Sequence, residues 1–157
     1  MLSPQSLQQI DTELAKYPAD QRRSAIMGAL RIAQAEKGYL APETIAYVAD
    51  YIGITAAQAY EVATFYNMYN LEPVGKYKLT VCTNLPCALR GGIDAGEYLK
   101  QKLGIGYGET TADGKFTLLE GECMGACGDA PVMLVNNHKM CSFMDAEAIE
   151  KKLAELQ

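Results

Sequence analysis

The spacing of apolar residues divides the chain into a helical first part and a mixed second part. In roughly the first 70 residues, apolar side chains recur every three or four positions, as on the buried face of an amphipathic helix. The four stretches carry Leu7, Ile10, Leu14 and Tyr17; Ile26, Leu30 and Ala33; Ile45, Val48, Ala49 and Ile52; and Tyr60, Val62, Ala63, Phe65 and Tyr66. We therefore predict four helices, the second of them running from Asp20 to Glu36.

Residues typical of helix ends separate these stretches. Ser3–Pro4 precedes the first helix, and proline suits the first turn of a helix. Gly38 and Gly53 follow the second and third helices, where a glycine commonly ends a helix. Thr55 and Gln58 have the spacing of a capping box at the start of the fourth. Residues 1–72 are thus predicted to form a helical bundle.

After Pro73–Val74–Gly75 the pattern changes from helical to alternating. Tyr77, Leu79 and Val81 alternate with polar residues and lead directly to Cys82, which predicts a half-buried strand. The later elements are predicted as a helix over 89–103, a glycine-rich loop over 104–114, a strand over 116–119, a hairpin of 132–135 and 140–143 around Asn136–Asn137, and a final helix that Asp145 caps.

The resulting order in residues 73–157 is β-α-β-β-β-α. A helix that connects two strands favours parallel, right-handed pairing of those strands, and the hairpin adds an antiparallel pair. Thioredoxin-like folds have this organisation. We predict an α+β protein, with an N-terminal helical bundle followed by a thioredoxin-like domain, although this order implies no function by itself.

Composition excludes several classes of function. The 157 residues have a net charge of −5, whereas nucleic-acid binding requires fields of Lys and Arg. No apolar run approaches the ~20 residues of a membrane-spanning helix. The N-terminus is polar and lacks the basic start and apolar stretch of a signal peptide. We therefore expect a cytoplasmic protein without direct membrane insertion, whose five cysteines remain reduced.

Four of these cysteines form two closely spaced pairs. Cys82 and Cys87 follow the first predicted strand, and Cys123 and Cys127 follow the second. Two such pairs on neighbouring loops suit a metal centre with four thiolate ligands. Structural zinc sites favour the tighter C-x2-C spacing, but thiolates bind zinc and iron–sulfur clusters alike. The spacing favours an iron–sulfur cluster and leaves zinc open.

Local features near the pairs also favour a cluster. Gly121, Gly125 and Gly128 permit close backbone approach, so that amide N–H groups could reach the sulfurs. Cys87 precedes the predicted helix at 89–103, whose N-terminal partial charge would favour an anionic cluster. A Rieske centre requires two histidine ligands, and His138 is the only histidine in the chain.

The fifth cysteine and the other short motifs are not expected to form a functional site. The chain has no C-x-x-C, the motif of a thioredoxin-type dithiol. Cys141 lies in a predicted strand and is interpreted as a small buried apolar residue. GIGYG, at the start of the 104–114 loop, lacks the spacing of a dinucleotide-binding motif and follows a helix, so no nucleotide site is expected in this chain.

Several motifs together resemble one family. The chain contains ATFY before the first strand, Gly-Lys entering it, C-x4-C, TTADGKF, C-x-G-x-C and a following Ala-Pro. It resembles the thioredoxin-like [2Fe–2S] subunits of NADH:quinone oxidoreductase, the respiratory complex I, over nearly its whole length. Met124 stands where relatives often have leucine, a change that conserves apolar volume.

The resemblance implies specific ligands and partners. Cys82, Cys87, Cys123 and Cys127 correspond to the ligands of the family's [2Fe–2S] cluster. NADH and FMN belong to a flavoprotein partner subunit, and this chain would exchange single electrons with that FMN without being catalytic alone. The complex would place the chain on the cytoplasmic face of the inner membrane.

The helical bundle is expected to dock that partner, because aromatic residues are enriched at interfaces. Its candidates are Tyr47, Tyr51, Tyr60, Phe65, Tyr66 and Tyr69. The equivalent subunit of an NAD-linked hydrogenase or formate dehydrogenase remains an alternative. A zinc-stabilised interaction module and a free-standing ferredoxin are the alternatives from other classes.

Overall fold

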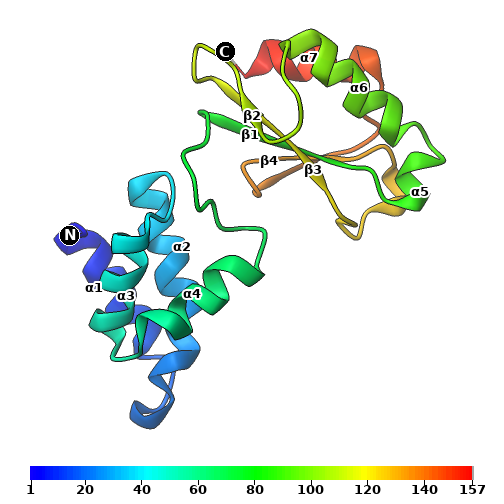
Figure 1. Ribbon diagram of the computed structural model, residues 1–157. Helices are drawn as coiled ribbons and strands as arrows, with labels where there is room; N and C mark the ends of the chain where they lie inside the picture. Colours follow the sequence, from blue (N-terminus) through cyan, green and yellow to red (C-terminus); the bar gives the residue numbers. More distant parts are fainter. Residues whose placement is uncertain (157) are drawn as a thin grey trace. The chain divides into compact units, whose positions relative to one another are not determined.

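A computed structural model of the protein describes residues 1–156 and divides the chain into two compact units (Figure 1). The division falls between Pro73 and Val74, within the segment where the apolar period changes. Each unit has a hydrophobic core of its own. The two units are therefore described separately.

The first unit is all helical. It contains α1 (Pro4–Leu14), a 3-10 segment η1 (Ala19–Ala25), α2 (Ile26–Lys37), α3 (Pro42–Ile52) and α4 (Ala56–Phe65) (Figure 1). The apolar faces predicted for α1, α2 and α3 point into one core, whose most deeply buried large side chains are Ile10, Leu30, Leu40, Ile45, Val48 and Ile52. Of the fourth stretch only Val62 and Ala63 join this core, because Tyr60, Phe65 and Tyr66 are exposed. The prediction of four helices in this unit is confirmed.

The second of these helices is shorter than its predicted span of Asp20 to Glu36. The segment before Ile26 is a 3-10 helix with a non-helical conformation at Gln21. This segment is rich in polar residues, so it offers no apolar face to bury, and the Arg22 guanidinium instead donates to the Ile52 carbonyl at 2.9 Å. Tyr17 also lies outside α1, because the following Pro18 disfavours a helical conformation at the residue before it.

The second unit is built on a five-stranded sheet of order β2-β3-β1-β4-β5. The strands are β1 (Tyr77–Cys82), β2 (Glu109–Thr110), β3 (Phe116–Gly121), β4 (Met133–Val135) and β5 (Lys139–Cys141). The central strands β1 and β3 are parallel, and every other pair is antiparallel. The predicted parallel pairing and hairpin are both confirmed, with Asn136 and Asn137 at positive φ in the turn.

Two long helices cover one face of this sheet. They are α6 (Gly92–Leu103) and α7 (Ala146–Glu155), which lie on the same side of the strands in Figure 1. Alternation along β1 directs Leu79 and Val81 to this face, where they pack with Leu99 of α6 and Ile149 of α7. The apolar half of each strand therefore forms the core of the unit.

Three local features differ from the sequence prediction. The helix expected over 89–103 begins only at Gly92, as α6, because Gly91 turns the chain at a φ of 92°, and the short helix α5 (Leu85–Ala88) before it was not predicted. The expected loop at 104–114 contains the short edge strand β2. The hairpin strands are shorter than predicted and end before Ser142.

The alternation in β3 provides a test of this packing. Leu118 is fully buried beneath α6, whereas its neighbour Leu119 is half-buried on the opposite face. We expect Leu118→Ala to lower the free energy of unfolding by about 2–5 kcal/mol, because it leaves a cavity in the core. Leu119→Ala should cost clearly less, as urea unfolding of both variants would measure. Equal losses would contradict the assigned faces.

Candidate metal centre

The parallel pairing of β1 and β3 determines where the four predicted ligands lie. Cys82 is the last residue of β1 and pairs with Gly121, the last residue of β3. Helix α5 follows β1 and carries Cys87, and Cys123 follows Gly121. Both predicted pairs therefore start from the same edge of the sheet.

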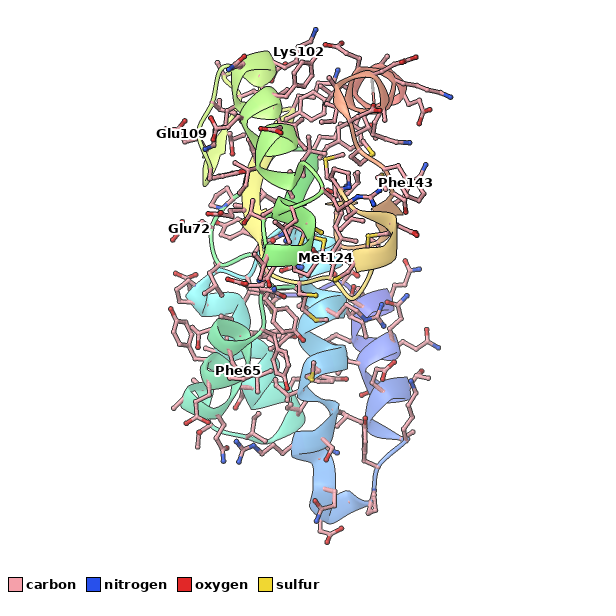
Figure 2. The ribbon with its side chains drawn as sticks, turned by 90° about the vertical axis from the view of Figure 1, so that its right-hand side faces the viewer. Phe65, Glu72, Lys102, Glu109, Met124 and Phe143 are labelled. Atoms are coloured by element: carbon pink, nitrogen blue, oxygen red, sulfur yellow. The ribbon has the colours of Figure 1, made fainter. Side chains whose placement is uncertain are left out.

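Cys82 and Cys87 form a buried pair. Each residue is only 1% exposed, and both pack with Ala130, Val132 and the partly buried Met124, which is labelled in Figure 2. Burial, and next a hydrogen bond between the two thiols, raises the pKa of Cys87 to about 11. The Val132 amide opposes this rise by donating to the same sulfur. The Val132 amide therefore stabilises the thiolate form of Cys87.

Cys123 and Cys127 form an exposed pair. Their Sγ atoms are 3.8 Å apart, and the Gly125 N–H donates to Cys123 Sγ at 3.5 Å. The hydrogen bond with Cys123, and then burial, raises the pKa of Cys127. A smaller contribution to that rise comes from Cys82, so the two pairs are near enough to act on each other.

The three glycines near the second pair have different roles. Gly125 has a φ of 74° and its amide contacts a sulfur, which confirms the predicted role. A Cβ on Gly121 would lie 2.6 Å from Thr80 Cγ2, so this glycine permits close packing. The space around Gly128 is open, and nothing in its surroundings requires glycine.

One predicted feature near Cys87 is wrong. Cys87 does not lie directly before the N-terminus of the long helix, because that helix begins five residues later, at Gly92. It lies instead within the four-residue α5, between Asn84 as N-cap and Leu89 as C-cap. The chain turns at Gly91, which the single helical pattern over 89–103 did not indicate.

The donor set suits a binuclear thiolate centre. All four cysteines are free thiols, grouped as two pairs, and backbone amides donate to one sulfur of each pair. Within residues 1–156, no group of three or more Cys, His, Asp or Glu side chains is placed so that it could hold a metal ion, and the thiols are grouped only as the two pairs. A [2Fe–2S] cluster takes four cysteine ligands, and the two pairs could supply them.

The fifth cysteine does not join this group. Cys141 lies in β5, where it faces Met133 across the hairpin and packs in the core of the second unit. Burial raises the pKa of its thiol. The prediction that Cys141 is a small buried apolar residue is confirmed.

Sequence reasoning did not identify the segment that covers the buried pair. Ala130 and Val132 pack against Cys82 and Cys87, and the Cys82 N–H donates to the Val132 carbonyl at 3.1 Å. The peptide bond between Ala130 and Pro131 is cis. The Ala-Pro that follows Cys127 was the available signal, but only as part of the family resemblance.

Comparison with known proteins agrees with this donor set. The model of the thioredoxin-like [2Fe-2S] ferredoxin family matches residues 10–157. The chain belongs to this family. The resemblance and the predicted α+β, thioredoxin-like fold class are thereby confirmed, and the cofactor of the family is a [2Fe–2S] cluster.

Two curated relatives cover most of the chain. Both are named as subunits of NADH-quinone oxidoreductase. The one from Rickettsia typhi is 49% identical over 128 residues, which are 81% of this chain and 75% of that protein. The one from Thermus thermophilus is 41% identical over 148 residues, which are 94% of this chain and 82% of that protein.

A solved structure shares the fold at lower identity. A chain of an NAD+-reducing [NiFe]-hydrogenase in the air-oxidized state matches with a TM-score of 0.69 and 20% identity over 82% of this chain. The match spans only 22% of that hydrogenase chain. At this identity the likeness concerns the fold alone.

The burial of the thiols predicts their order of alkylation in the cluster-free protein. Thiolate is the reactive form, so we expect iodoacetamide at pH 8 to modify exposed Cys123 first, and buried Cys87 and Cys141 last. Because the pKa of Cys87 is about 11, the alkylation rate of Cys87 should increase about tenfold for each unit by which the pH is raised, until the pH approaches that value. Peptide mass spectrometry would measure the order, and modification of Cys87 as fast as Cys123 would contradict it.

A second prediction concerns the close approach of α6 to the backbone at Cys82 and Cys87. A Cβ on Gly92 would lie 2.7 Å from the Cys82 carbonyl oxygen and 2.9 Å from that of Cys87. We expect Gly92→Ala to lower the free energy of unfolding by about 1–3 kcal/mol and to reduce bound iron, since backbone must move. Gly128→Ala, placed in open space, is the control and should change neither quantity by a comparable amount.

Proposed function

We propose that this chain is the electron-transfer subunit of an NADH:quinone oxidoreductase, with its [2Fe–2S] cluster on Cys82, Cys87, Cys123 and Cys127. The observation that carries the proposal is the arrangement of two thiol pairs at the joined ends of β1 and β3. The extensive identity with subunits named for that complex supports the same function.

In this proposal the thiolates of both cysteine pairs would hold the cluster. The bound cluster supplies a site that takes up and releases one electron at a time. The chain excludes water from the Cys82–Cys87 half, whose residues are buried with Val132 and Met124. The amides of Gly125 and Val132 donate to sulfur, which stabilises the thiolate ligands.

The electron partner in this proposal is a flavoprotein subunit that binds FMN and NADH. The supporting observation is the name that the relatives share, NADH-quinone oxidoreductase, together with the lack of a dinucleotide-binding motif in this sequence. No helix among residues 1–156 is both long and apolar enough to cross a bilayer. The chain would act as a peripheral subunit on the cytoplasmic face of the inner membrane.

The first unit would provide the docking surface, through aromatic residues on and after α4. Phe65, labelled in Figure 2, is 79% exposed, and Tyr60 and Tyr66 are also exposed. The other predicted aromatic residues serve the bundle itself: Tyr69 is buried and donates to the Met27 carbonyl, Tyr51 donates to Asp11, and Tyr47 packs on the core.

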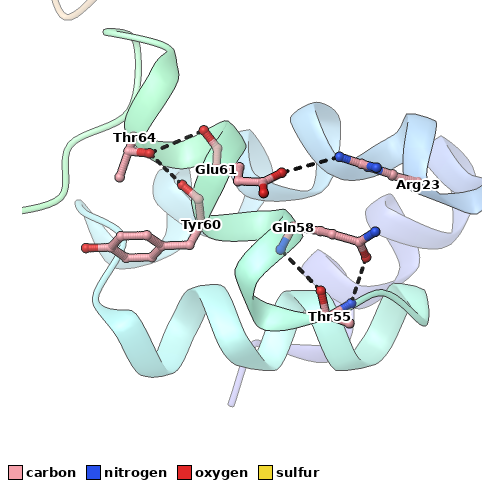
Figure 3. A network of polar contacts seen from close by, with 6 residues as sticks. All are labelled: Arg23, Thr55, Gln58, Tyr60, Glu61 and Thr64. Carbon is pink, nitrogen blue, oxygen red and sulfur yellow. Dashed lines mark hydrogen bonds and ion pairs between the residues drawn. The ribbon is translucent and has the colours of Figure 1, made fainter.

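Polar contacts define the start of α4 and connect its surface to the 3-10 segment, and the side chains of Tyr60, Phe65 and Tyr66 remain exposed. Thr55 and Gln58 form the predicted capping box at its start (Figure 3). Glu61 pairs with Arg23 at 3.5 Å, and Tyr60 projects from α4 away from this ion pair (Figure 3). Tyr60 and Phe65 therefore project from α4, whose first turn is capped and whose Glu61 faces Arg23, and Tyr66 follows as its C-cap.

The proposed ligands can be tested with a matched pair of cysteine variants. We expect the purified chain to contain about two irons and two acid-labile sulfides, with a paramagnetic signal after dithionite reduction. Cys123→Ser should remove most of the iron and this signal, whereas Cys141→Ala should retain both. Circular dichroism of Cys123→Ser should retain the helical signal, because the first unit has a separate core.

The outcomes separate the alternatives. Zinc without labile sulfide in a folded chain would overturn the electron-transfer proposal in favour of a zinc-stabilised module. Loss of iron in Cys141→Ala would overturn the ligand assignment. Collapse of the whole chain in Cys123→Ser would contradict the independence of the first unit.

A further inference from the structure

Two side-chain hydrogen bonds connect the loop of the first cysteine pair to the segment that leads to the second. Thr83 Oγ1 donates to Glu120 Oε1 at 2.7 Å, and Asn84 Nδ2 donates to Glu122 Oε2 at 2.5 Å. Thr83 and Asn84 lie between Cys82 and Cys87, and Glu122 directly precedes Cys123. The first bond therefore joins the loop after Cys82 to β3, in which Glu120 lies, and the second joins it to the residue before Cys123.

These bonds lie where the backbone pairing of the sheet ends. The register of β1 and β3 closes at Cys82 and Gly121, and the Thr83 N–H makes one further backbone bond to the Gly121 carbonyl at 3.3 Å. Beyond Gly121 the chain to Ala126 is neither helix nor strand. The position of Cys123 thus depends on contacts other than the ladder of the sheet.

The Asn84 side chain bonds to Glu122 and does not cap its own helix. It occupies the N-cap position of α5, where an asparagine side chain usually bonds to the amides of its own helix. It makes no such bond here and donates across to Glu122. The side chain acts between the two loops.

We propose that Glu120 and Glu122 are positioning residues for the cluster. Their hydrogen bonds with Thr83 and Asn84 hold the loop after Cys82 to the end of β3 and to the segment that leads to Cys123, and their negative charges lower the reduction potential. The inference rests on the proposed cluster at Cys82, Cys87, Cys123 and Cys127. These two contacts are called the loop clamp below.

The effect on potential follows from charge. Reduction adds one negative charge to the cluster, and a nearby carboxylate disfavours that addition. Glu120 also raises the pKa of Lys100, and this cation partly balances its charge. Glu122, next to the ligand Cys123, should therefore have the larger effect.

The experiment separates charge from hydrogen bonding in the full chain with its cluster. Glu122→Gln and Glu120→Gln remove the charge and keep an oxygen that accepts the same bond. Thr83→Val and Asn84→Ala remove the donor and keep the charge. The controls are Glu147→Gln, an exposed carboxylate of α7, and Thr12→Val, whose hydroxyl bonds to the Gln8 carbonyl in the first unit.

Each pair of variants has a distinct expected result. Glu122→Gln should retain its iron and sulfide. In a redox titration its midpoint potential should be raised, and the rise should exceed that in Glu120→Gln and that in Glu147→Gln. Thr83→Val and Asn84→Ala should each release the cluster to a chelator about three to ten times faster than Thr12→Val, because each lacks one hydrogen bond.

A measurement on the cluster-free protein tests the clamp independently. Thr83→Val and Asn84→Ala should speed hydrogen exchange of the amides at 122–127 relative to Thr12→Val. A potential in Glu122→Gln no higher than in Glu147→Gln would overturn the charge effect. Unchanged exchange or unchanged cluster release in Thr83→Val and Asn84→Ala would overturn the clamp. A lack of cluster in the unsubstituted chain would instead overturn the proposed function, and the exchange result would still decide on the clamp.

Discussion

The parallel pairing of β1 and β3 is the constraint on which the rest of the second unit depends. Parallel strands end at the same edge of a sheet, so Cys82 and Gly121 meet as partners and the two cysteine-bearing loops leave from one place. Antiparallel pairing of these strands would put the loops at opposite edges. The register matters equally, because a slip of one residue would exchange the faces of the strand and expose Leu79 and Val81 while turning Cys82 toward the helices.

The two cysteine pairs differ in their surroundings, and this difference divides the proposed site into an insulated half and an accessible half. Cys82 and Cys87 are enclosed by Met124, Ala130 and Val132. The thiols of Cys123 and Cys127 are exposed. Because burial raises the pKa of Cys87, occupation by metal must displace a firmly held proton there. An accessible half suits a cluster that exchanges electrons with a group on another protein.

The two units have separate cores and separate physical tasks. The first unit packs its helices around Leu30 and Ile45 and contributes exposed aromatic side chains, with Phe65 the most exposed of them. The second unit packs α6 and α7 on its sheet and positions the thiols. Neither core includes residues of the other unit, so the packing that positions the thiols and the packing that presents the aromatic residues are separate.

The sequence by itself determined the features that local pattern controls. Apolar spacing located the four helices, alternation located β1, and Asn136–Asn137 marked the hairpin, because these depend on neighbours along the chain. The spacing of the cysteines identified the pairs, and the family motifs identified the cofactor. Only the tertiary structure decided which pair is buried, where α5 ends and α6 begins, that β2 pairs with β3, and that Val132 covers Cys87. These depend on contacts between residues far apart in sequence, whose burial no local period encodes.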